Sequence, residues 1–81
     1  MARVSGKQDD DGQLKALGAA IRARRKAVGI SQEALADAAG IDRSHMGKVE
    51  RGERNVTILN VMRVAAALGE RPSEILSAAG M

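Results

Sequence analysis

Two short amphipathic segments separated by a glycine-bearing turn constrain this chain more than any other feature. The first, SQEALADAAG, begins at Ser31, a residue type that favours a helix N-terminus, and ends at Gly40. The second, IDRSHMGKVERG, has Asp42 as a helix cap and Gly52 as its end. Apolar residues recur at helical spacing in both segments. The sequence therefore predicts two packed helices joined by a tight turn.

The residue types around this turn fit one supersecondary geometry. Ala36 is small where the two helices approach each other, and Gly40 can adopt the positive φ that the turn requires. Three apolar residues are spaced to hold the second of the two helices on the core: Ile41, Met46 and Val49. Two helices that cross at a wide angle through a short glycine-bearing turn form a helix-turn-helix.

Helical periodicity continues on both sides of this pair. Over residues 13–28 the apolar positions at helical spacing are Leu14, Leu17, Ile21 and Val28. A fourth helix is expected from the Thr57 cap to Leu68, and a short fifth helix from Pro72. Because no alternating β pattern occurs, the predicted fold class is all-α with five short helices.

Charge and composition divide the chain into a tail and a domain. Residues 1–12 have little apolar content, two glycines and three consecutive aspartates, so we expect a flexible tail there. Residues 13–81 carry 11 bases and seven acids and are long enough for one modest core. Such a basic balance is compatible with nucleic acid or with an acidic membrane surface. We therefore expect one domain over residues 13–81.

Composition also excludes several classes of protein. The chain has no cysteine and a single histidine, so neither a disulfide framework nor a Cys/His metal site is expected. It has no paired-carboxylate or phosphate-loop motif, which argues against an enzyme, a cofactor or a small-molecule ligand. No segment reaches the ~18 apolar residues of a membrane span, and no secretory signal is present. A cytoplasmic location without a membrane partner is the expectation.

A helical wheel of residues 43–51 separates two faces. Met46 and Val49 define the buried side, with His45 and Glu50 at its margins. The opposite side presents bases, a hydroxyl and a glycine: Arg43, Ser44, Gly47, Lys48 and Arg51. Arginine can bind guanine through two hydrogen bonds, serine can bond to several bases, and glycine lets the backbone come close. A solvated face would not need a glycine that costs about 1 kcal/mol relative to alanine, so this face indicates DNA recognition.

The chain resembles the Xre/Cro-type helix-turn-helix family of phage repressors and bacterial regulators in the run LGAAIRARRKAVGISQEALADAAGIDRSHMGKVERGERNVTILNVMRVAAALG. The motifs S-Q-x-x-L-A, A-G-I and E-R-G together carry the resemblance. Within the family, the segment GIDRSHMGKVERGERNVT is most similar to the small controller proteins of restriction–modification systems. The resemblance implies a lambda-repressor-like domain and a sequence-specific transcriptional regulator of double-stranded DNA, with residues 42–51 as the recognition helix in the major groove.

The resemblance and the wheel together assign roles to individual residues. The residues expected to contact bases are Arg43, Ser44, His45, Gly47 and Lys48. Those expected to contact the DNA backbone are Gln32, Arg51, Arg54 and Asn55. Gln32 opens the second helix, and a helix N-terminus independently suits a phosphate. For His45, a partly buried packing role is the alternative.

Glu50 is the one acid within residues 43–51, among the bases of the predicted recognition helix. An unpaired carboxylate at the edge of a buried face would be unfavourable, and a forked guanidinium is its natural partner. In the family, an arginine late in the first helix pairs with this glutamate, and Arg25 occupies the matching position. The resemblance therefore implies a structural ion pair between Arg25 and Glu50.

A single recognition helix is too small for a specific site, and proteins of this kind read half-sites about 34 Å apart as dimers. We expect a homodimer through the apolar surface of the fourth and fifth helices, including Pro72, Ile75 and Leu76. Ile75 and Leu76 could instead complete the core of the monomer. The alternative function is an antitoxin-type protein-interaction module that also binds DNA, and non-specific DNA compaction is a further possibility.

Overall fold

The computed structural model describes Asp9 and residues 12–81, and this part of the chain forms five α-helices. In chain order they are α1 (Gln13–Val28), α2 (Gln32–Ala39), α3 (Arg43–Glu50), α4 (Ile58–Leu68) and α5 (Pro72–Ala78). The predicted all-α class is thereby confirmed. The predicted tail lies outside the described residues, apart from Asp9 and Gly12. None of the five helices is both long and apolar enough to cross a bilayer.

Side chains and glycines at the helix ends determine where the helices start and stop. The hydroxyls of Ser31 and Thr57 and the carboxylate of Asp42 each accept a first-turn backbone N–H, at 3.0–3.2 Å. Gly40 ends α2 with φ 69°, a left-handed conformation that glycine adopts without strain. The N–H of Ile41 then donates to the carbonyl of Ala36 at 2.9 Å, which completes the tight turn into α3.

Asp9 caps α1 from outside the helix. Its carboxylate accepts the backbone N–H groups of Leu14 at 2.9 Å and of Lys15 at 3.2 Å. An acid at this end also complements the positive end of the helix dipole. Asp9 therefore has a structural contact, although it lies in the segment that was expected to be a flexible tail.

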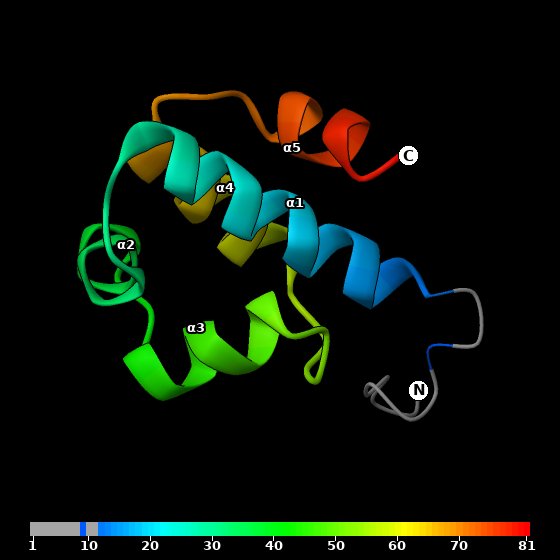
Figure 1. The fold of residues 1–81 in the computed structure, drawn as a ribbon, viewed down its shortest axis with the longest axis horizontal. Coiled ribbons are helices and arrows are strands. Elements are labelled where there is room, and N and C mark those ends of the chain that lie inside the picture. Colours follow the sequence, from blue (N-terminus) through cyan, green and yellow to red (C-terminus); the bar gives the residue numbers. More distant parts are fainter. Residues whose placement is uncertain (1–8, 10–11) are drawn as a thin grey trace.

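The helix α1 is the central element of the fold. It packs against α3, α4 and α5, and Figure 1 shows α3 and α5 on opposite sides of it, with α4 behind. The helix α2 packs on α3 and α4. Each helix contributes one large, fully buried apolar side chain to the core: Ile21, Leu35, Met46, Val64 and Ile75.

The helix α5 turns its apolar side inward. Ile75 is 0% exposed, and Leu76 is half-buried against the same core. Ile75 therefore has no surface left for a second copy of the chain, and its assignment to a dimer interface is wrong. The reason is that α5 packs on both α1 and α4, so its one large buried side chain completes the monomer.

The contact between α1 and α3 is unusually close. Gly18 of α1 is buried where the C-terminal end of α3 lies against it, and no space is left there for a side chain. Gly52, just after α3, is likewise buried against the backbone of Lys15. Because neither glycine has a side chain, the end of α3 can lie directly on the surface of α1. This close contact fixes how α3 projects from the domain.

Candidate nucleic-acid interface

The outer side of α3 carries most of the side chains predicted to read bases. Arg43 and Ser44 are exposed, and His45 and Lys48 are half-buried. Met46 and Val49, on the opposite side, are buried in the core. The helix therefore presents a basic and hydroxyl-bearing surface while its apolar side anchors it to the domain.

Gly47 does not lie on the exposed face, and that part of the expectation is wrong. The residue is buried, and a β-carbon at position 47 would lie 3.2 Å from both Nη1 of Arg51 and Oε1 of Gln32. These two long side chains cover the backbone of α3 at this point. The glycine therefore accommodates the ends of these two side chains, which cover its backbone.

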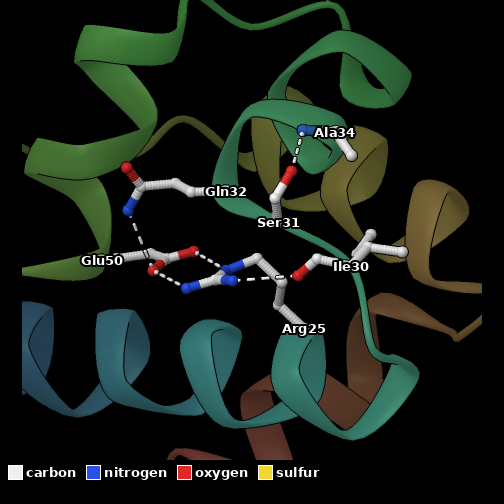
Figure 2. Close-up of polar contacts among 6 residues, drawn as sticks. All are labelled: Arg25, Ile30, Ser31, Gln32, Ala34 and Glu50. Carbon is white, nitrogen blue, oxygen red and sulfur yellow. Dashed lines mark hydrogen bonds and ion pairs between the residues drawn. The ribbon is translucent and has the colours of Figure 1, made fainter.

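A hydrogen-bonded network beneath this surface joins α1, α2 and α3 (Figure 2). Arg25 donates through Nε to Oε2 of Glu50 at 2.8 Å and through Nη2 to Oε1 at 3.1 Å. Its third nitrogen, Nη1, donates to the carbonyl of Ile30 in the loop before α2, at 3.0 Å. Gln32, the first residue of α2, donates through Nε2 to Oε1 of Glu50 at 3.1 Å. One carboxylate therefore fixes three elements relative to one another.

Burial makes this network strong. Arg25 is 9% exposed and Glu50 6%, and no buried side-chain nitrogen or oxygen among the described residues lacks a hydrogen-bond partner. The hydrogen bonds to Glu50 raise the pKa of Arg25, and burial opposes that effect. Paired charges with every donor used can be tolerated in an interior, whereas removing one partner would leave the other uncompensated. The Arg25–Glu50 ion pair implied by the resemblance is thus present, and Gln32 joins it through a hydrogen bond to Glu50.

Two of the predicted DNA-contacting arginines lie beside acids on the surface. Nη1 of Arg43 is 3.6 Å from Oε2 of Glu33, and Nε of Arg51 is 2.9 Å from Oε2 of Glu53. The hydrogen bond from Arg51 lowers the pKa of Glu53. Exposed pairs of this kind contribute little to stability, so both guanidinium groups can exchange these partners for a phosphate or a base.

The remaining predicted backbone contacts surround α3. Arg54 and Asn55 are exposed in the loop between α3 and α4, and Gln32 is half-buried at the N-terminus of α2. Ser31 caps only the N–H of Ala34 in that first turn. Unpaired first-turn amides give a helix N-terminus the partial positive charge that suits a phosphate.

An open hollow beside α3 contains one further basic residue, Arg22, which is not among the residues predicted above to contact DNA. It is lined by Arg22, Arg25, Gln32, Glu50 and Arg51. Arg22 precedes Arg25 by three residues on α1, so the two side chains share a helix face. The three-residue spacing could have indicated that Arg22 also lies toward α3, because Arg25 was expected to pair with Glu50. No group of three His, Cys, Asp or Glu side chains in the described part of the chain is arranged to hold a metal ion.

Comparison with known proteins identifies the domain. A family model described as helix-turn-helix matches residues 21–75, which includes the α2–turn–α3 unit and most of the core. The chain belongs to the helix-turn-helix family. Members of this helix-turn-helix family and the relatives below are DNA-binding regulators rather than enzymes, in agreement with the prediction.

Several relatives of this helix-turn-helix protein are controller proteins. Control protein C.SmaI of Serratia marcescens is 38% identical over 61 residues, which are 75% of this chain and 73% of that protein. The crystal structure of the restriction-modification controller protein C.AhdI from Aeromonas hydrophila matches with a TM-score of 0.75 and 47% identity, over 76% of this chain and 94% of that chain. The clp gene regulator ClgR from Corynebacterium glutamicum matches with a TM-score of 0.81 and 31% identity, over 84% of this chain and 72% of that chain. The resemblance to controller proteins is thereby confirmed.

Proposed function

We propose that this helix-turn-helix protein regulates transcription by binding operator half-sites as a homodimer, with α3 in the major groove. The observation that carries the proposal is the outer surface of α3. It presents Arg43, Ser44 and Lys48, while the Arg25–Glu50 pair fixes the helix from its inner side. Reading bases requires such a helix to hold a constant orientation, because hydrogen bonds to base edges depend on direction.

The base-reading role is assigned to four residues on this surface. Arg43 is the main candidate, because a guanidinium can donate two hydrogen bonds to the O6 and N7 atoms of guanine. Ser44 and Lys48 lie on the same side of α3, and His45 lies beside them. Gly47 has no such role, because Gln32 and Arg51 cover it.

The DNA-backbone role is assigned to residues around the recognition helix. Gln32, Arg51, Arg54 and Asn55 come from the N-terminus of α2 and from the segment that follows α3. Contacts to phosphate position a protein on the duplex but carry no sequence information directly. Substitutions at these positions should therefore weaken binding to all sequences alike.

Exposed apolar side chains on α4 support a homodimer. Ile58, Leu59 and Met62 are all more than half exposed, although residues of this size usually bury. Their positions at spacings of one, three and four residues place them on one side of the helix. We assign the interface to this side of α4, with the half-buried Pro72 and Leu76 of α5 retained from the sequence-based expectation.

The likeness to controller proteins supports a role within a restriction–modification system. Identity is 47% to C.AhdI and 31% to ClgR, although the TM-score to ClgR is the higher of the two. The fold is therefore common to regulators of different genes, and sequence similarity favours the controller role. Methyltransferase and endonuclease genes beside this gene would support it, whereas a toxin gene there would favour an antitoxin.

Selection of bound DNA from a random library tests the proposal. The wild-type protein should select a site with two related half-sites about one helical turn apart. Arg43→Ala should relax the selected consensus at one position in each half-site and weaken binding by about 1–3 kcal/mol. Gln32→Ala should weaken binding with no change in consensus. A wild-type protein that enriches no sequence, or an Arg43→Ala variant with an unchanged consensus, would contradict this function or this residue respectively.

A further inference from the structure

The hollow beside α3 is a basic surface built by three helices. Arg22 and Arg25 reach it from α1, Gln32 from α2, and Glu50 with Arg51 from the C-terminal end of α3. Three guanidinium groups therefore face one carboxylate. That carboxylate already accepts three hydrogen bonds from Arg25 and Gln32, so its charge is largely compensated.

The donors in this hollow are not equally available. Arg25 directs all three of its nitrogens to Glu50 and Ile30. Arg51 bonds to Glu53 through Nε and Nη2, which leaves Nη1 on the side of Gln32 and Gly47. Because Gly47 has no side chain, the ends of Gln32 and Arg51 lie together there.

Arg22 differs from the arginines around it. Arg24 is paired with Glu70 at 2.7 Å, Arg25 with Glu50 and Arg51 with Glu53. Arg22 is exposed and forms no ion pair with any residue that the structure describes. Its guanidinium therefore borders a basic hollow without an acid of its own among these residues. This is the arrangement expected for a group that meets a phosphate, whose oxygens accept bonds from several donors at once.

We propose that Arg22 is a DNA-backbone contact and that Arg22, Gln32 and Arg51 together bind one phosphate of the duplex in this hollow. The inference rests on the proposed function, because it requires α3 to lie in the major groove. It adds α1 to the DNA-binding surface that the proposed function places on α2, α3 and the following loop. A phosphate bound between three helices would also fix the depth at which α3 enters the groove.

The salt dependence of DNA binding tests this proposal. For each protein, the dissociation constant is measured on one duplex at several salt concentrations, and the slope of log K against log salt is compared. Each phosphate contact contributes about 0.9 to the magnitude of that slope. Arg22→Ala should lower it by about this amount per bound protomer and should leave the selected consensus unchanged, and Arg22→Lys should retain most of it.

Lys26→Ala is the matched control. Lys26 is an exposed base one turn further along α1, and it does not line the hollow. The two alanine variants lose the same charge, so a general electrostatic effect would change both slopes equally. Equal slopes for the two variants would overturn the assignment of Arg22, and so would a shift of consensus in Arg22→Ala.

The proposed function and this inference fail in different ways. A wild-type protein that binds DNA without sequence preference contradicts the proposed function, yet the two slopes on that DNA still decide the role of Arg22. A wild-type protein that binds no DNA overturns both. Thermal unfolding of Arg22→Ala should match that of the wild type, because the side chain is exposed.

Discussion

Gly18 of α1 lies so close to the backbone of Glu50 that a β-carbon on residue 18 would be 2.6 Å from the Glu50 carbonyl oxygen. The carbonyl oxygen of Val49 would be closer still. Neither atom belongs to a flexible side chain, so any larger residue at position 18 must push α3 away from α1. The same displacement would strain the Arg25–Glu50 pair, which joins these two helices.

Gly18→Ala should destabilise the domain despite the better helix propensity of alanine. Propensity alone would favour the variant by about 1 kcal/mol. We expect the forced separation of α1 and α3 to outweigh this and to give a net loss of about 1–3 kcal/mol. Urea unfolding followed by circular dichroism measures it. An unfolding midpoint equal to or above that of the wild type would show that the helices can separate without penalty.

Gly47→Ala is the contrasting substitution, because the new methyl group would meet only the movable ends of Gln32 and Arg51. Stability should be unchanged or should rise by up to about 1 kcal/mol, from helix propensity. DNA affinity should fall, because both displaced side chains are assigned to the DNA backbone. Urea unfolding and a DNA titration of the same sample separate the two effects. Undiminished affinity would contradict the assigned role of Gly47 in shaping this surface.

Glu50→Ala should be among the most damaging single substitutions in the domain. It leaves the Arg25 guanidinium buried without its partner, and breaking a buried pair typically costs about 3–5 kcal/mol. Glu33→Ala is the matched control, since it removes an acid that pairs with Arg43 on the exposed surface. Its effect on stability should be small. Equal unfolding midpoints for the two variants would mean that the buried network contributes little.

Met62→Lys should abolish the proposed dimer without unfolding the monomer. The side chain is 51% exposed on the outer side of α4, so a lysine can be solvated there once the chain is monomeric. Val28→Lys is the control, because Val28 is 49% exposed but lies at the end of α1. Sedimentation at micromolar concentration should show a dimer for the wild type and for Val28→Lys, and a monomer for Met62→Lys. A monomeric wild type would exclude the interface.

The Arg51–Glu53 pair should be visible in an acid titration. The hydrogen bond from Arg51 holds the pKa of Glu53 below its ordinary value, so the pair contributes its stability above that ordinary value. The contribution is lost as the pH falls through the lowered pKa of the folded state. Nuclear magnetic resonance of the Glu53 carboxyl carbon should show the titration moving upward in Arg51→Gln. The same midpoint in both proteins would show that the pair is not formed in solution.

The helix boundaries could be predicted because their signals are local. Ser31, Asp42 and Thr57 bond to amides within the next few residues, so the sequence around each cap contains both partners. The cap from Asp9 spans a longer separation and was therefore missed. The Arg25–Glu50 pair spans 25 residues, and it was found only through the family resemblance.

The exposure of individual residues was harder to predict, because it depends on neighbouring elements. The spacing within α3 placed Gly47 on the outer side, but the side chain of Gln32 comes from α2 and covers it. Ile75 and Ile58 are the same residue type in neighbouring helices, and one is fully buried while the other is 66% exposed. The burial of Ile75 depends on the packing of α5 against α1 and α4, which the sequence of α5 alone does not give.

The buried network has a consequence for how target sequences can change. Its bonds reach α3 through Glu50, on the inner side, and no side-chain hydrogen bond among the described residues links it to Arg43, Ser44 or Lys48. The orientation of the helix is thus set separately from the chemistry that it displays. Related proteins, or a designer, could replace the outward side chains and obtain new DNA specificities on an unaltered scaffold.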